Sequence, residues 1–318
     1  QTFYETTSLN HTKKLLIEDE VFAFIGHQFG PLDDVERSYM SEIGLPIVGI
    51  TRMTKEFKPY LIDEAFFLTD TYHRSEAQHI LQMITNYTFD GTFDPSKKMG
   101  VILEDSGFSN AVAAGLTEYA ELNDYDGLVY QYVSNNPQDI DNAVQHLKDA
   151  NVDAVIITTT HSLLESLLVS MQANGLHKDT YTTARNGNPF SSHRYLDFDV
   201  YANGFFNVYT DYEQTTLSSY FDLLSAVLSG TDHESLLYNP FLIQGFQAAY
   251  IFVEGLRRLE DKEVTFESFM EAMREAPIFV PFAGFYNYET MHHTLAPFKY
   301  NASDNKFYQI GDYVMQIR

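Results

Sequence analysis

The chain has 318 residues, a hydrophobic fraction of 44% and a formal net charge of -24 at pH 7. This length is typical of about two domains, and so acidic a protein repels phosphate backbones and anionic headgroups, which argues against nucleic-acid and membrane-surface binding. The sequence has no Cys, which excludes disulfides, thiol catalysis and Cys-ligated metals, and no apolar run approaches the roughly 20 residues of a membrane helix.

Short apolar runs alternate with helical patterns along the first two thirds of the chain. The runs are almost continuously apolar, which is typical of strands that are covered on both faces of a parallel sheet. We predict strands at Val21–Ile25, Pro46–Ile50, Ala65–Leu68, Met99–Leu103, Leu128–Val133, Ala154–Thr159, Thr180–Thr183 and Gly204–Tyr209. We predict helices between them at Ser8–Asp19, Leu32–Ile43, His73–Tyr87, Asn110–Leu122, Pro137–Ala150 and Ser162–Asn174.

Two helix boundaries carry local signals. Asn136-Pro137 supplies an N-cap and a proline at the first helical position, and Asn174-Gly175 supplies a C-terminal stop. After Tyr209 the pattern changes to helices predicted at Tyr212–Ser229, Pro240–Arg258 and Phe266–Ala276, followed by short strands within Phe282–Arg318.

The alternation of strands and helices predicts parallel sheets with right-handed crossovers. A Gly-, Pro- and Asp-rich interruption at Phe89–Lys98 separates two such series, so we expect two α/β lobes. Ligands bind outside the carboxyl ends of the strands in such sheets. This rule selects the loops Gly26–Leu32, Thr51–Thr54, Thr69–Tyr72, Glu104–Ser109, Thr159–Ser162 and Ala184–Asn188.

Sequence motifs for catalysis are missing: the chain has no nucleophile elbow, P-loop, G-x-G-x-x-G or H-E-x-x-H. His73, Glu76 and His79 recur at steps of three, but the two histidines diverge around a helix axis, and we interpret this stretch as solvent-exposed helix surface. His292 and His293 lie among strand or turn residues, and adjacent residues of a strand face opposite sides, so we do not expect them to share a metal. We therefore expect no metal, no cofactor and no enzymatic activity, although spacing alone does not exclude a Ser/His/Asp triad.

Five segments carry a family resemblance in order over nearly the whole chain. They are LIEDEVFAFIGHQFGP, IGLPIVGIT, VILEDSGFSNAVAAGL, DIDNAVQHLKDANVDAVIITTTHSLLESLLVSMQANGL and QGFQAAYIFVEGLRRL. These segments resemble the type I periplasmic binding proteins, and most of all the branched-chain amino-acid-binding group of ABC-transporter receptors. The resemblance implies an α/β fold of two doubly wound parallel-sheet lobes, joined by a three-segment hinge, that closes over a small ligand outside the cytoplasm.

The resemblance also implies where the lobes divide and where this chain departs from the family. The first lobe would comprise 1–96 plus 211–277, and the second 97–210 plus 278–318. The first lobe is expected to lack an N-terminal strand–helix–strand unit, with Gln1–Glu5 as a remnant of the second strand. Gly30-Pro31-Leu32 replaces the family's usual hydroxyl for a ligand carboxylate. Ala184 replaces the acidic residue that meets an amino group, which argues against an amino-acid ligand.

Candidate ligand-binding residues come from the selected loops. They are Phe29, Gly30, Thr51, Arg52, Tyr72, Phe108, Thr160, His161, Arg185 and Asn186. Gly30 permits close backbone approach, a buried Arg is a strong carboxylate clamp, and His161 can hydrogen-bond and titrate near neutral pH. Structural alternatives stay open: Phe108 as a core contact at a helix start, His161 as a helix cap, and Arg185 with Asn186 as a surface loop.

The charges of two candidate residues predict the class of ligand. Arg52 and Arg185 come from loops of opposite lobes, and two facing cations repel unless an anion lies between them. A carboxylate without an α-amino group would therefore be preferred to leucine or valine. The alternative is that both side chains point to solvent and leave a neutral, aromatic cleft.

Together these observations predict a non-catalytic solute-binding receptor, periplasmic or extracellular, that delivers a small polar ligand (an amino acid or a carboxylic acid) to an ABC importer permease. One alternative is a ligand-sensing ectodomain whose partner is a receptor signalling domain. A lipoprotein signal encoded before Gln1 favours transport, and a transmembrane helix favours sensing. The other alternative is an enzyme with an unrecognised site, which a bound metal or turnover would favour.

Overall fold

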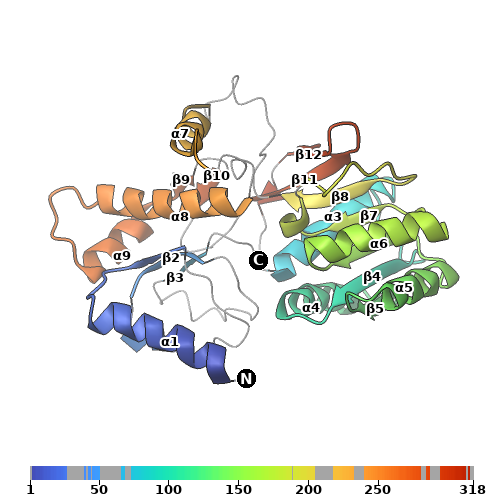
Figure 1. The fold of residues 1–318 in the computed structure, drawn as a ribbon, viewed down its shortest axis with the longest axis horizontal. Coiled ribbons are helices and arrows are strands. Elements are labelled where there is room, and N and C mark those ends of the chain that lie inside the picture. Colours follow the sequence, from blue (N-terminus) through green and yellow to red (C-terminus); the bar gives the residue numbers. More distant parts are fainter. Residues whose placement is uncertain are drawn as a thin grey trace. The chain divides into compact units, whose positions relative to one another are not determined.

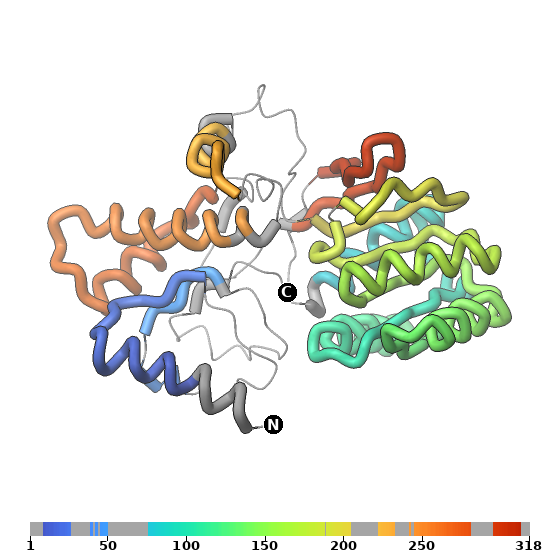
Figure 2. Tube along the Cα trace, in the orientation of Figure 1, coloured from blue at the N-terminus to red at the C-terminus, as the bar shows by residue number. Residues whose placement is uncertain are grey.

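The computed structural model places the chain in two compact units. It describes residues 2–26, 39–40, 42–43, 45–50, 66–68, 73–187, 189–204, 218–232, 240–280, 284–286, 294–312 and 314–315, most of which are coloured in Figure 2. Apart from the last two residues, unit 1 takes Gln1–Thr71 and Leu217–His293, and unit 2 takes Tyr72–Thr216 and Thr294–Gln316. Each unit therefore combines segments that are far apart in the sequence.

An eight-stranded sheet organises unit 2 (Figure 1). Its order is β12-β11-β8-β7-β6-β4-β5, with β13 paired to β11. Strands β4 to β8 are parallel, and β11, β12 and β13 add antiparallel pairs. The strands are β4 (Met99–Glu104), β5 (Leu128–Val133), β6 (Ala154–Thr158), β7 (Thr180–Thr182), β8 (Val200–Gly204), β11 (Thr294–Asn301), β12 (Lys306–Gln309) and β13 (Val314–Met315).

Both predicted helix-boundary signals are confirmed in unit 2. The side chain of Asn136 accepts the N–H of Gln138 at 2.9 Å, and Gly175 ends its helix with φ at 70°, in the left-handed region. The helical elements are α3 (His73–Tyr87), α4 (Gly107–Leu122), α5 (Pro137–Asp149), α6 (His161–Asn174) and the short 3-10 turn η2 (Ala184–Asn186).

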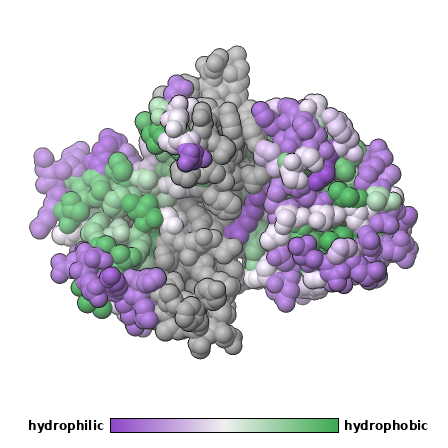
Figure 3. Space-filling view, viewed as in Figure 1, coloured by the Kyte–Doolittle hydropathy of each residue, from purple (hydrophilic) through white to green (hydrophobic). Residues whose placement is uncertain are grey.

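Two apolar cores lie on opposite faces of the unit 2 sheet. Val101 and Leu103 of β4 pack in one core with α3 and α4, and Ile102 packs in the other with α5 and α6. Alternate residues of a strand face opposite sides, so a strand with helices on both faces is apolar throughout. In the view of Figure 3, hydrophilic residues cover much of the outer surface of this unit.

The order of the parallel strands creates a switch point. The chain leaves β4 through α4 toward the edge strand β5, and it leaves β6 through α6 toward β7 in the opposite direction. Adjacent strands whose connections run in opposite directions leave a crevice at their carboxyl ends. The carboxyl ends of β4 and β6 are therefore the expected binding edge of this sheet.

Unit 1 contains a parallel three-stranded sheet of β1 (Phe24–Ile25), β2 (Ile47–Ile50) and β3 (Phe66–Leu68). Its core joins Val48 to Ile251 and Phe269 of two long helices. A Cβ at Gly49 would collide with Ala248, so glycine permits close approach of helix and strand there. The other elements are α1 (Thr2–Ile17), α7 (Ser218–Leu228), α8 (Pro240–Arg257), α9 (Phe266–Glu275) and a hairpin of β9 (Ile278–Val280) and β10 (Gly284–Tyr286).

The predicted α/β fold class is confirmed, with three differences in detail. Residues 2–5 belong to α1 and are not a remnant strand, because nothing between Thr2 and Ile17 interrupts the helix: the segment has neither Gly nor Pro. Strand β8 covers Val200–Gly204, the segment that pairs with β7 and β11, and so overlaps the predicted strand Gly204–Tyr209 only at Gly204; residues 205–209 lie outside the described residues. Helix α3 lies in unit 2, although the predicted boundary was near residue 96, because Ile80 and Ile84 pack in a unit 2 core.

Candidate functional site

Three segments that are distant in sequence meet at the carboxyl ends of β4, β6 and β7. The carboxylate of Glu104, at the end of β4, accepts the N–H of Thr160 after β6 at 2.6 Å. The side-chain amide of Asn186, after β7, donates to the carbonyl of Thr159 at 3.0 Å. These bonds tie the three strand-end loops together at one edge of the sheet.

Two helices begin at this edge. Ser106 caps α4, where its side chain accepts the N–H of Ser109 at 3.3 Å, and the Ser109 hydroxyl donates to the carbonyl of Thr158 at the end of β6. Thr160 is the N-cap of α6. The first N–H groups of a helix carry partial positive charge, so this edge favours an anionic or polar group.

Arg185 and Phe108 are in direct contact. The guanidinium carbon of Arg185 lies 4.5 Å from the centre of the Phe108 ring, in cation–π geometry. Phe108 is half-buried and also packs against the core beneath α3 and α4. The structural alternative for Phe108, a core contact at a helix start, therefore holds for part of the ring, and its contact with a ligand stays a prediction.

His161 is the first residue of α6 and is held from two directions. Its ring stacks on Phe190 with centroids 5.5 Å apart, and its Nε2 lies 3.2 Å from the carbonyl of Pro189 and 3.4 Å from Oε1 of Glu165. Burial disfavours the charged form of Glu165, but hydrogen bonds from Ser191 and Arg194 outweigh it and lower the pKa of that carboxyl. His161 thus anchors the 189–194 segment and does not cap its helix.

A buried polar cluster on α3 was missed by the sequence analysis. Glu76 is 1% exposed, His79 3% and Asn203 of β8 0%, so the interpretation of this stretch as solvent-exposed helix surface is wrong. Glu76 accepts the N–H of Ala184 at 2.6 Å, and Nδ1 of His79 lies 2.5 Å from Oδ1 of Asn203. Residues three apart share a helix face, and this face points to the sheet.

The ten predicted ligand-binding residues divide into two groups. Those described lie together at this edge: Phe108, Thr160, His161, Arg185 and Asn186. The others, Phe29, Gly30, Thr51, Arg52 and Tyr72, lie outside the described residues. The sequence placed the strand-end loops together, but it gave no sign that Arg185 stacks on Phe108 or that α3 supports their edge.

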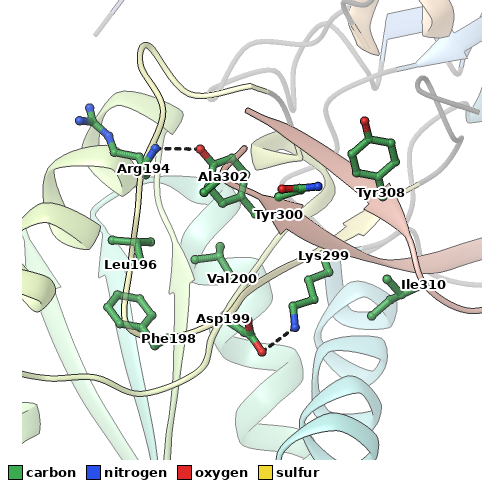
Figure 4. A pocket seen from close by; sticks show the side chains of 11 residues that line it. Arg194, Leu196, Phe198, Asp199, Val200, Lys299, Tyr300, Ala302, Tyr308 and Ile310 are labelled. Atoms are coloured by element: carbon green, nitrogen blue, oxygen red, sulfur yellow. Dashed lines mark hydrogen bonds and ion pairs between the residues drawn. The ribbon is translucent and has the colours of Figure 1, made fainter. Parts of the chain in front are cut away.

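A separate surface pocket of about 510 Å³ opens at the amino end of β8, at the other end of the parallel strands (Figure 4). Two bonds join residues that line it: Nζ of Lys299 donates to Asp199 at 2.7 Å, and the backbone N–H of Arg194 donates to the hydroxyl of Tyr300 at 2.9 Å. We interpret it as a surface depression rather than the functional site. It is lined by Arg194, Leu196, Phe198, Asp199, Val200, Lys299, Tyr300, Asn301, Ala302, Tyr308 and Ile310.

Within the described ranges, no group of three or more His, Asp or Glu side chains is arranged to hold a metal ion. None of the helices in these ranges combines the length and the apolar character needed to cross a bilayer.

Comparison with known proteins gives one family and many similar structures. The profile of the family described as "Periplasmic binding protein" matches residues 5–304. No curated protein sequence matches the chain. A branched-chain amino acid ABC transporter protein from Thermus thermophilus with bound valine aligns with TM-score 0.75 and 15% identity, over 99% of this chain and 83% of that chain. A solute-binding protein of an ABC transporter from Rhodopseudomonas palustris BisB5, in complex with 3,4-dihydroxybenzoic acid, gives TM-score 0.70, 14% identity and coverages of 99% and 84%.

Proposed function

Because this chain belongs to the periplasmic binding protein family, we propose that it is an extracytoplasmic receptor that binds a small solute and delivers it to an ABC importer. It acts on the periplasmic or extracellular side of the membrane and performs no catalysis. Ligand binding shifts its population toward the conformation that the importer recognises.

The observation that carries the ligand class is the stacking of Arg185 on Phe108 at the edge formed by β4, β6 and β7. A guanidinium presents its donors in the plane of the group, in the fork geometry that suits a carboxylate. The N-termini of α4 and α6 add partial positive charge at the same edge. The ligand is therefore a small carboxylic acid, with Phe108 as an apolar contact.

Two further considerations support this class. The similar structures described above hold valine and 3,4-dihydroxybenzoic acid, which share a carboxylate. Ala184 supplies no carboxylate of its own for an α-ammonium group. The ligand is therefore an acid without an α-amino group.

The test is a thermal-shift titration of the purified protein with 4-hydroxybenzoate, benzoate, valine, leucine and glucose, after native mass spectrometry for any ligand carried through purification. A ligand at ~100 times its dissociation constant adds about 2.7 kcal/mol of stability. We expect stabilisation by the aromatic acids, lost in Arg185→Gln and kept in the matched control Lys178→Gln, which removes a cation near the amino end of β7.

Two results would contradict the proposal. Stabilisation by valine and leucine but by no acid lacking an amino group refutes the ligand class. No stabilisation by any solute, together with no mass retained by the native protein, refutes the receptor function.

A further inference from the structure

We propose that Glu76 of α3 is a positioning residue, whose buried carboxyl group holds the turn Ala184–Asn186 and thereby keeps Arg185 stacked on Phe108, ready for the ligand. The part of this inference that concerns the ligand rests on the proposed function. The part that concerns the turn stands on the geometry alone.

The turn has a backbone donor that it cannot satisfy by itself. In η2 the N–H of Asn186 bonds to the carbonyl of Thr183 and the N–H of Gly187 bonds to the carbonyl of Ala184. The N–H of Ala184 opens the turn, and the first N–H groups of a helical turn have no partner within it. Oε1 of Glu76 accepts this N–H at 2.6 Å, from a residue 108 positions earlier in the chain.

Glu76 is itself fixed by a second layer of hydrogen bonds. The side-chain amide of Asn203 donates to the backbone carbonyl of Glu76 at 3.2 Å. Oδ1 of Asn203 lies 2.5 Å from Nδ1 of His79. Because an amide oxygen only accepts hydrogen bonds, the proton of the neutral His79 ring is on Nδ1. Asn203 therefore connects two successive turns of α3 to β8, and all three side chains are almost fully buried.

Both ends of the turn are anchored, and Arg185 lies between the anchors. Glu76 holds Ala184, while the side-chain amide of Asn186 donates to the carbonyl of Thr159 at 3.0 Å and to Oγ1 of Thr182 at 2.8 Å. Arg185 is half-exposed and is the residue of the turn whose side chain reaches Phe108. Releasing Ala184 therefore frees the backbone of Arg185 while the apolar cores stay intact.

A positioning role and a purely stabilising role make different predictions, which three variants separate. Glu76→Ala removes the acceptor, and Glu76→Gln keeps an acceptor oxygen of the same reach. Ser170→Ala is the matched control: it removes the 2.6 Å bond from Ser170 to Asp141, between α6 and α5. That bond lies in the second half of α6, away from the turn.

Nuclear magnetic resonance of the whole protein supplies two readouts that need no ligand: amide hydrogen exchange at residues 184–187, and the ring-current shift that Phe108 imposes on Arg185. In Glu76→Ala we expect exchange at these amides to rise by at least about tenfold, since a lost bond to a buried donor is worth that factor or more, and the ring-current shift to disappear. Glu76→Gln restores both, and Ser170→Ala changes neither. Should Glu76→Ala fail to fold, Glu76→Asp, which keeps the carboxylate but falls short of Ala184, is expected to give the same two changes.

Affinity for 4-hydroxybenzoate, by isothermal titration calorimetry, tests the link to the ligand. We expect about tenfold weaker binding in Glu76→Ala and near-normal binding in Glu76→Gln and Ser170→Ala. Unchanged exchange and an unchanged ring-current shift in Glu76→Ala overturn the proposal. The proposal is also overturned if Ser170→Ala changes the exchange and the ring-current shift as much as Glu76→Ala does, because Glu76 would then act only through the general stability of the protein. If the unmodified protein binds no carboxylic acid, the proposed function fails, whereas exchange and ring-current shift still decide whether Glu76 holds the turn.

Discussion

The contact between Arg185 and Phe108 predicts a measurable coupling energy. The guanidinium carbon lies 4.5 Å from the ring centre, and both residues are partly exposed. Cation–π pairs contribute from about 0.5 kcal/mol at exposed sites to about 2 kcal/mol where water is excluded, so an intermediate site should give about 1 kcal/mol. Phe108→Leu removes the ring and keeps an apolar side chain, and Arg185→Gln removes the charge.

A double-mutant cycle on these two positions isolates the pair. Urea unfolding followed by circular dichroism gives the free energy of unfolding of the parent, both single variants and the double variant. We expect the two single losses to sum to about 1 kcal/mol more than the loss in the double variant. The control pair is Arg185→Gln with Phe93→Leu, because Phe93 packs against Tyr119 and Tyr125 and not against Arg185. A coupling no larger than in the control pair would refute the stacking.

Three further predictions concern the stability of the protein. Burial lowers the pKa of His79, and the Asn203 hydrogen bond and the Glu76 charge oppose this with smaller effects. As the pH falls, the unfolded chain therefore takes up a proton on His79 before the folded protein does. The urea midpoint should then fall below pH 6.5, the pKa of His79 in the unfolded chain, and it should fall less in His79→Gln. In urea unfolding, Thr88→Val should destabilise the protein more than Tyr181→Phe does. Thr88→Val leaves the buried hydroxyl of Tyr181 without its 2.6 Å partner, whereas in Tyr181→Phe the hydroxyl of Thr88 keeps its 3.0 Å bond to Asp179. The net charge of -24 predicts that the thermal midpoint rises with sodium chloride, as self-repulsion is screened; a midpoint unaffected by salt would contradict this.

Elements that depend on local pattern were predictable from the sequence. Helix α3 has the predicted bounds, His73–Tyr87, because its apolar residues recur at helical spacing. Strands β4 to β7 lie within one residue of their predicted ends, because continuous apolar runs bounded by polar turns are typical of strands covered on both faces. Membership of the family was also predictable, since the resembling segments keep their order along the chain.

Features that depend on distant partners were not predictable. Glu76 and His79 look like solvent-exposed residues, and their burial is decided by Ala184 and Asn203, more than a hundred positions later. Nothing near Glu76 in the sequence indicates that its carboxylate accepts the backbone N–H of Ala184. The position of β8 depends in the same way on pairing with β11, from the far end of the chain. The loops of the candidate site followed from the general rule on strand ends, whereas their contacts did not.

The pairing of β8 with β11 also constrains the order in which unit 2 is assembled during synthesis. The two strands are neighbours in the sheet, yet the whole segment Leu217–His293 of unit 1 is made between them. Until that segment has emerged, β8 is an open edge, and open edges are templates for pairing with other chains. A chaperone or a delay in release that protects this edge would therefore raise the yield of folded protein, and truncation before Thr294 should convert a soluble product into an aggregating one.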